Sequence, residues 1–213
     1  MKNIVVLISG SGSNLQAILE ACDASMPNAH VSAVFSNKAD AYGLERAKQF
    51  NVDGHFVDPK AFDSRNAFDA ELMKQIDQYQ PDVVVLAGYM RILSSEFVLH
   101  YMGKMINIHP ALLPKYKGLN THQRALESGD SEHGASVHFV IPELDAGTVI
   151  IQGIVPVNEN DTVEELQQRV HKVEHQIYPQ AVKYLAEDGL TLKSDQLFFK
   201  GEVLNKPFTE YLK

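Results

Sequence analysis

The sequence predicts an α/β fold of the doubly wound type, in which a mainly parallel sheet is flanked by helices. Short apolar runs rich in β-branched residues recur along the chain and are bounded by turn-forming residues, as strands are. Segments between the early runs carry apolar residues at spacings of three and four, which is the pattern of an amphipathic helix. The strand segments are apolar on both faces, which indicates burial between two helical layers.

Six segments are predicted as strands. They are residues 3–8, 31–35, 83–87, 105–108, 137–141 and 149–157. Because strand and helix alternate in the first half of the chain, the early strands are expected to pair in parallel through helical crossovers.

Three helices are predicted from spacing and from end signals. Apolar stripes mark the first two helices: Leu15, Ile18, Leu19 and Cys22, then Phe68, Leu72, Ile76 and Tyr79. The third helix opens with a capping-box pattern from Thr162 to Glu165, and Pro179 is expected to kink it. The tail, residues 189–213, is predicted to form a small hairpin or an extended cover rather than a second domain.

The composition fits one compact domain over residues 1–213. A chain of 213 residues, 45% of them hydrophobic, can bury about 70% of the surface that its unfolded form exposes. The formal net charge of −8 makes nucleic acid an improbable partner. No apolar run approaches the roughly 20 residues that span a bilayer, so no membrane contact is expected. The single cysteine and the lack of a secretory signal favour a cytoplasmic protein.

The first predicted strand runs directly into a turn of small residues, SGSGSN at positions 9–14, and then into a helix. Glycines permit a tight turn and the helix N-terminus attracts anions, so this pattern is typical of a phosphate site. A plain tight turn with a Ser or Asn cap is the alternative. The dinucleotide fingerprint would need glycine at position 15, which is Leu15, and no Gly-Lys pair follows for a P-loop.

A second group of polar residues follows the strand at 105–108. Alternation along this strand puts Asn107 and His109 on one face, at the strand end where open α/β sheets bind ligands. The alternative is a strand end whose polar residues meet water. Asp145 lies in ELDAG, residues 143–147, where an ordinary turn is the simpler interpretation. Beside His109, however, its carboxylate would fix the imidazole tautomer and support the charged ring.

The segment HKVEH, residues 171–175, matches the inverted zinc-protease pattern, with His171 and His175 one helical turn apart. A third ligand would have to come from the short tail that follows. A solvated helix face explains the pattern better, and no metal is expected.

Seven stretches together resemble the phosphoribosylglycinamide formyltransferase family, the folate-dependent enzymes of purine biosynthesis. They are IVVLISGSGSNLQAI, VFSNKADAYGLERA, AFDSRNAFD, PDVVVLAGYMRIL, NIHPALLPKYKGL, GASVHFVIPELDAGTVIIQ and VEHQIYP. They extend over essentially the whole chain. NIHPALLP-like segments also occur in other formyl-folate enzymes, so the specificity lies in the complete set. The resemblance implies a formyltransferase-type, Rossmann-like fold.

The resemblance also implies a role for each candidate residue. The catalytic group would be Asn107, His109 and Asp145. Gly12, Ser13 and Asn14 would hold the phosphate of glycinamide ribonucleotide, and Glu174 its ribose hydroxyls. Folate would lie against Met90, Arg91, Ile92 and Leu93, with the backbone of Val140 to Asp145 along its pterin ring and Arg65 near its glutamate tail. The N-terminal half would thus bind mainly the ribonucleotide, and the C-terminal half would bind mainly folate and carry the catalytic residues.

The implied reaction is transfer of the formyl group of 10-formyltetrahydrofolate, a co-substrate, to the amine of phosphoribosylglycinamide. The partners would be these small molecules, and the protein a monomer or weak homodimer. Both substrates are anionic, so the basic residues expected to offset the acidic chain are Arg65, Arg91, Lys115 and Lys117. Three alternatives stay open: a nucleotide sensor without turnover, an NADP-dependent oxidoreductase suggested by Lys38, and a hydrolase of formyl-folate.

Overall fold

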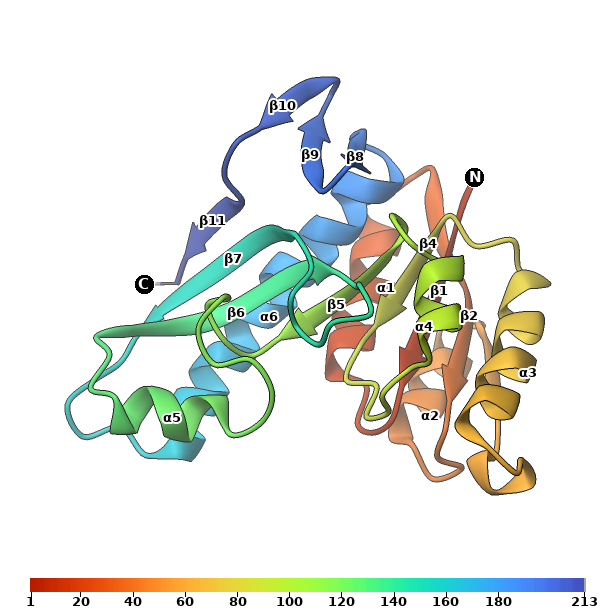
Figure 1. Ribbon diagram of the computed structural model, residues 1–213, viewed down its shortest axis with the longest axis horizontal. Coiled ribbons are helices and arrows are strands. Elements are labelled where there is room, and N and C mark those ends of the chain that lie inside the picture. Colours follow the sequence, from red (N-terminus) through yellow and green to blue (C-terminus); the bar gives the residue numbers. More distant parts are fainter. Residues whose placement is uncertain (213) are drawn as a thin grey trace.

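The computed structural model describes residues 1–212 as two sheets and six α-helices. The strands of the main sheet are β1 (Lys2–Ile8), β2 (Ala29–Ser36), β3 (Asp53–Phe56), β4 (Val83–Leu86), β5 (Met105–His109), β6 (Glu132–Phe139), β7 (Val149–Pro156) and β11 (Phe208–Tyr211). Their order across this eight-stranded sheet is β11-β7-β6-β5-β4-β1-β2-β3. A small sheet contains β8 (Leu190–Lys193), β9 (Gln196–Phe199) and β10 (Glu202–Leu204). Figure 1 shows this small sheet beyond the end of the longest helix.

The main sheet is mainly parallel, as predicted. Strand β1 pairs in parallel with β2 and β4, and the parallel pairing continues to β3 on one side and β5 on the other. Strand β6 is antiparallel to both β5 and β7, and β11 is parallel to β7. The pairing therefore changes from parallel to antiparallel after β5, and of the later strands in this sheet only β6 and β7 are joined without an intervening helix.

Helices cover both faces of the sheet. They are α1 (Ser13–Ser25), α2 (Tyr42–Gln49), α3 (Arg65–Asp77), α4 (Ser95–His100), α5 (Thr121–Glu127) and α6 (Val163–Ala186), with a 3-10 turn at Pro59–Ala61. Alternate residues of β1 enter two separate cores. Ile4, Val6 and Ile8 pack with residues of α1 and α6, whereas Val5 and Leu7 pack with residues of α3 and α4. Figure 1 shows these helix pairs on opposite sides of the sheet.

The tail differs from its predicted form in one respect. Its first part makes the expected hairpin, since β8 and β9 pair antiparallel and β10 adds to β9. Its last part, however, is β11, which extends the main sheet alongside β7. The tail is therefore a hairpin followed by an edge strand. The strand predicted at 137–141 is also displaced, because β6 begins at Glu132 and ends at Phe139.

The longest helix, α6, begins as predicted. The Thr162 hydroxyl accepts the Glu165 N–H at 3.2 Å, and the Glu165 carboxylate accepts the Thr162 N–H at 2.9 Å. The helix continues through Pro179, whose nitrogen has no hydrogen to donate to the carbonyl of His175. The kink expected there stays a prediction. Within residues 1–212, none of the helices is long and apolar enough to cross a membrane.

Tyr178 connects α6 to the centre of the sheet. Its ring is buried, and its hydroxyl oxygen lies 2.8 Å from the carbonyl oxygen of Leu86 in β4 and 3.2 Å from that of Ile106 in β5. This contact ties the helix to the two strands that end beside the candidate site described below.

Removing this hydroxyl should therefore destabilise the fold. We expect Tyr178→Phe to lower the free energy of unfolding by about 1 to 2 kcal/mol, the usual cost of losing a buried hydrogen bond. Urea unfolding followed by circular dichroism measures the change. Tyr42→Phe is the control because Tyr42 is largely exposed. Equal unfolding midpoints for the two variants would contradict the bridging role.

Candidate active site

The predicted site residues gather at the carboxyl ends of three neighbouring parallel strands. Strand β1 leads into the turn at 9–14, β4 into the segment 87–94, and β5 ends at His109. Because β1, β4 and β5 are adjacent and parallel, their carboxyl ends lie at one edge of the sheet. This is the edge where open α/β sheets bind ligands.

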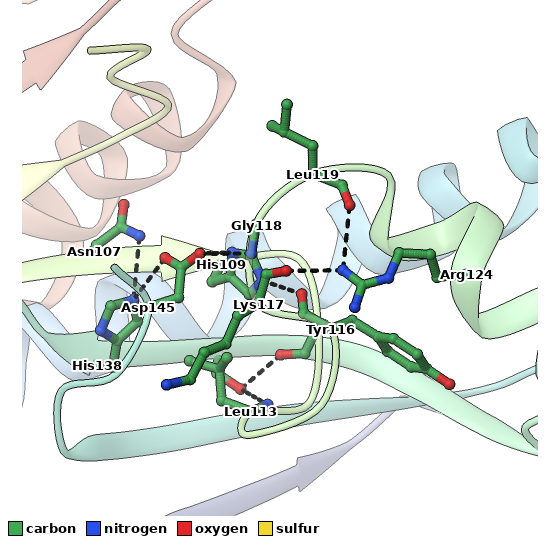
Figure 2. Close-up of polar contacts among 12 residues, drawn as sticks. Asn107, His109, Leu113, Tyr116, Lys117, Gly118, Leu119, Arg124, His138 and Asp145 are labelled. Atoms are coloured by element: carbon green, nitrogen blue, oxygen red, sulfur yellow. Dashed lines mark hydrogen bonds and ion pairs between the residues drawn. The ribbon is translucent and has the colours of Figure 1, made fainter. Parts of the chain in front are cut away.

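His109 and Asp145 are in contact, although 36 positions (145 − 109) separate them in sequence. The Nδ1 atom of His109 lies 3.4 Å from Oδ2 of Asp145, and their side chains are only 6% and 8% exposed. On the other side of the ring, Nε2 lies 2.9 Å from the carbonyl oxygen of Tyr116. The ring is therefore held from both nitrogens, with the carboxylate on one side and the backbone carbonyl on the other. Figure 2 shows the carboxylate facing both His109 and the backbone of Gly118.

The loop that carries Asp145 is held tightly. Asp145 adopts a left-handed conformation with φ of 49°, and its Oδ2 accepts the N–H of Gly118 at 3.0 Å. A Cβ at Gly147 would overlap the carbonyl group of Phe139, so only glycine fits where the loop returns to β7. The turn interpretation and the contact with His109 are thus both correct for Asp145.

His138 is a member of this cluster that the sequence analysis did not identify. It stands opposite Asn107 in the β5–β6 pairing, and its Nε2 lies 3.2 Å from the amide nitrogen of Asn107. The Nδ1 atom lies 2.8 Å from the carbonyl oxygen of Phe139, so Nδ1 carries the hydrogen and Nε2 accepts. Burial lowers the pKa of His138, which keeps the ring neutral and suited to accept from Asn107. The alternation of Ser136 and His138 along the strand was the available sequence signal.

The segment after His109 is fixed to the sheet by a buried hydroxyl. Ser136 on β6 donates to the carbonyl of Ala111 at 2.7 Å and accepts the N–H of Leu113 at 3.0 Å. Gln152 on β7 donates to the same hydroxyl and to the Leu113 carbonyl. These bonds place the loop at 110–119 so that the Tyr116 carbonyl faces His109.

The predicted ribonucleotide residues also come together. Gly12 has φ of 71°, and a Cβ there would lie 2.7 Å from the α-carbon of Gly43, so the turn packs closely against α2. Ser13 and Asn14 begin α1, and the Asn14 amide donates to the Glu174 carboxylate at 3.0 Å. Burial raises the pKa of Glu174, and the Asn14 bond opposes that shift in part.

The predicted folate residues form a neighbouring wall. Met90 and Ile92 are largely exposed, while Leu93 and Val140 pack against the same core. The guanidinium of Arg91 lies over the ring of Phe68 at 4.6 Å from its centroid. Arg65 begins α3, one turn before that ring.

The zinc-protease pattern on α6 does not gather ligands. Glu174 is directed to Asn14, and His171 is exposed. Across residues 1–212, no group of three or more His, Cys, Asp or Glu side chains is arranged to hold a metal ion.

Known proteins are similar to this chain over most of its length, including the segments that form the site. A profile of the formyl transferase family matches residues 2–182. The phosphoribosylglycinamide formyltransferase of Escherichia coli is 55% identical over 202 residues, 95% of each chain. A trifunctional purine biosynthetic protein of Chironomus tentans is 46% identical over 193 residues, which are 90% of this chain and 14% of that protein. A solved structure of the phosphoribosylglycinamide formyltransferase from Coxiella burnetii, in complex with CHES, has a TM-score of 0.93 and 48% identity, and covers 98% of this chain and 99% of its own.

Two further histidines, His122 and His133, contact each other next to the loop at 110–119, where the ring of His133 packs against that of Tyr116. Nδ1 of His122 is 3.1 Å from Nε2 of His133, and His133 is only 1% exposed. Burial is the main cause that lowers the pKa of each ring, from 6.5 to about 4. The folded protein therefore holds this pair neutral.

The pair makes stability depend on pH. Both rings stay neutral in the folded protein down to about pH 4, whereas unfolded histidines bind protons near pH 6.5. The unfolded state takes up more protons in this window, so the free energy of unfolding should fall as the pH drops from 6.5 to 4. Urea midpoints at several pH values measure the slope. His133→Gln should flatten it, and the exposed His30→Gln should not. An unchanged slope in His133→Gln would contradict the assignment.

Proposed function

The chain belongs to the formyl transferase family, among the phosphoribosylglycinamide formyltransferases, and we propose that it transfers the formyl group of 10-formyltetrahydrofolate to the amine of phosphoribosylglycinamide through Asn107, His109 and Asp145. The products are the N-formyl ribonucleotide and tetrahydrofolate, in a step of purine biosynthesis. The observation that carries the residue assignment is the contact of His109 with Asp145 beside Asn107.

The reaction begins when the amine attacks the formyl carbon and forms a tetrahedral oxyanion. Asn107 donates one amide hydrogen to His138, which leaves its second hydrogen for the oxyanion. Such a donor contributes about 3 to 4 kcal/mol to transition-state stabilisation. Because His138 fixes the amide orientation, the donor is in place before charge develops.

His109 contributes charge and proton transfer. Its Nε2 faces the Tyr116 carbonyl and its Nδ1 faces Asp145, so both contacts hold the ring in place, and a protonated ring would stabilise the oxyanion. Asp145 orients the ring and sustains its charge. The Nδ1 side, next to the carboxylate, is the side from which a proton can pass between the attacking and leaving nitrogens.

Binding of the two substrates is assigned to the two walls of the site. The backbone N–H groups of 10–14 and the start of α1 suit a phosphate, and the buried Glu174 suits ribose hydroxyls. The exposed apolar side chains of Met90 and Ile92 suit the flat pterin and ring system of folate, with Arg91 and Arg65 beside α3 for its carboxylates.

The same proposal covers the organisation of the protein. A single domain over 1–213 carries the ribonucleotide site mainly in its N-terminal half and the catalytic residues in its C-terminal half. Glu174 is the exception, because it lies in the C-terminal half and is assigned to the ribonucleotide. The protein is proposed to act as a monomer or weak homodimer. The cytoplasmic assignment is supported by the composition, with its single cysteine.

Turnover tests the function against its alternatives. With both substrates present, we expect tetrahydrofolate and formylated ribonucleotide in equal amounts, and with 10-formyltetrahydrofolate alone no reaction. Spectroscopic assay of tetrahydrofolate and chromatography of the ribonucleotide measure both products. Formation of tetrahydrofolate without the ribonucleotide would indicate hydrolysis, and no tetrahydrofolate with both substrates present would favour a sensor. Reduction or oxidation of added NADP would favour an oxidoreductase.

Replacement of the imidazole tests the catalytic assignment. We expect His109→Ala to lower kcat by roughly 10² to 10⁴, with little change in ribonucleotide affinity, because the ring acts on the transition state. Steady-state kinetics and isothermal titration calorimetry separate the two effects. The exposed His30→Ala is the matched control and should keep normal turnover. Near-normal kcat in His109→Ala would refute its catalytic role.

A further inference from the structure

The segment at 87–94 is an irregular stretch of chain between β4 and α4 that has no helix or strand structure. Its side chains point in alternate directions. Met90 and Ile92 are each 67% exposed, whereas Leu93 packs against the core. An irregular backbone that presents exposed apolar side chains has a fixed shape only where other elements hold it. The contacts that hold this segment therefore decide where Met90 and Ile92 stand.

One of these contacts comes from the end of β1. Ser9 is 3% exposed, and its hydroxyl accepts the backbone N–H of Met90 at 2.8 Å. The hydroxyl hydrogen is directed elsewhere, to Oδ1 of Asn37 at the end of β2, at 2.5 Å. Ser9 thus uses one oxygen as donor and acceptor, and its orientation is fixed from both sides.

Ala87, at the start of the segment, also donates its N–H to the carbonyl of Leu7 in β1 at 2.9 Å. A further contact lies at the far end of the segment. The buried carboxylate of Asp69 on α3 accepts the N–H of Ser94 at 2.6 Å. Ser94 in turn caps α4, because its hydroxyl accepts the N–H of Phe97. Asp69 therefore holds the segment to the helical layer, with no link to the turn at 10–14.

Ser9 differs from Asp69 in its position along the chain. It begins the turn at 9–14, directly before residues 10–14 to which the phosphate is assigned, and its hydroxyl accepts the N–H of Met90, the first residue of the wall assigned to folate. We propose that Ser9 is a positioning residue that fixes the two substrate walls relative to each other. This inference rests on the proposed function. Transfer needs the amine and the formyl carbon at a defined separation, so a shift between the walls reduces productive alignment.

Four variants test this role. Ser9→Ala removes the link, and Asn37→Ala frees the Ser9 hydroxyl to rotate without altering Ser9 itself. Asp69→Asn weakens only the far contact. Ser32→Ala is the matched control, because its hydroxyl bonds the Ile4 carbonyl at 3.2 Å between β1 and β2, at the opposite end of those strands. Circular dichroism confirms folding, and kcat and KM are measured for each substrate.

We expect Ser9→Ala to lower kcat/KM about three- to ten-fold for both substrates, with part of the loss in kcat, as the loss of one positioning bond implies. Asn37→Ala should show a smaller loss of the same kind, and it decides the question if Ser9→Ala does not fold. Asp69→Asn should raise the KM for 10-formyltetrahydrofolate alone. Amide exchange of Met90, measured without substrates, should accelerate in Ser9→Ala and not in Ser32→Ala.

The possible outcomes distinguish a failure of the positioning role from a failure of the proposed function. If Ser9→Ala matches Ser32→Ala in every kinetic constant while the wild type turns over, the positioning role is wrong and the function stands. A loss of kcat/KM confined to 10-formyltetrahydrofolate would show that Ser9, like Asp69, holds only the folate wall. That result would also overturn the proposal that Ser9 fixes the two walls relative to each other. Absence of formyl transfer in the wild type would overturn the proposed function and this inference with it.

Discussion

The contact between His109 and Asp145 depends on the antiparallel part of the sheet. His109 ends β5, and Asp145 lies in the loop that joins β6 to β7. Because β6 runs antiparallel to β5, its carboxyl end and the loop after it would lie away from the carboxyl end of β5. The loop reaches back because it is long enough and closely packed, with the Phe139 N–H bonded to the Thr148 carbonyl at 3.0 Å. The N–H of Gly118 then holds the carboxylate from a second loop.

Burial determines what this contact can do. In a site shielded from water, an ion pair or a hydrogen bond to a charge is stronger than at the surface, and an unpaired charge is correspondingly costly. The side chains of His109 and Asp145 are only 6% and 8% exposed, so their contact is shielded from water in this way. His138, kept neutral beside them by burial, adds an acceptor for Asn107 without adding a competing charge. The two rings thus make separate contacts within one cluster, His109 with Asp145 and His138 with Asn107.

The sequence predicted the buried strands well because their own side chains carry the signal. Strands β1 and β4 are apolar on both faces, so no partner needs to be known to identify them. In contrast, β3 reads Asp-Gly-His-Phe and lies at the sheet edge, and α4 spans only six residues, so neither has enough apolar periodicity. The pairing of β11 with β7 depends on tertiary contacts, which the local sequence of the tail does not reveal. His138 escaped notice for a related reason, because its role follows from its register opposite Asn107.

The net charge of the chain has the same sign as the charge of the substrates that we assign to its site. The chain carries a net charge of −8, yet the substrates assigned to it are anions. Two of the expected basic residues are engaged elsewhere, since Lys115 pairs with Asp130 and Lys117 with Glu143. In the proposed function, the main phosphate donors are then the fixed backbone N–H groups at the start of α1, which cost no side-chain ordering. Because their positive potential falls off within about one helical turn, the proposed phosphate binding requires residues 10–14 to be held in place, and Ser9, which begins this turn, is bonded to Asn37 and to the backbone of Met90.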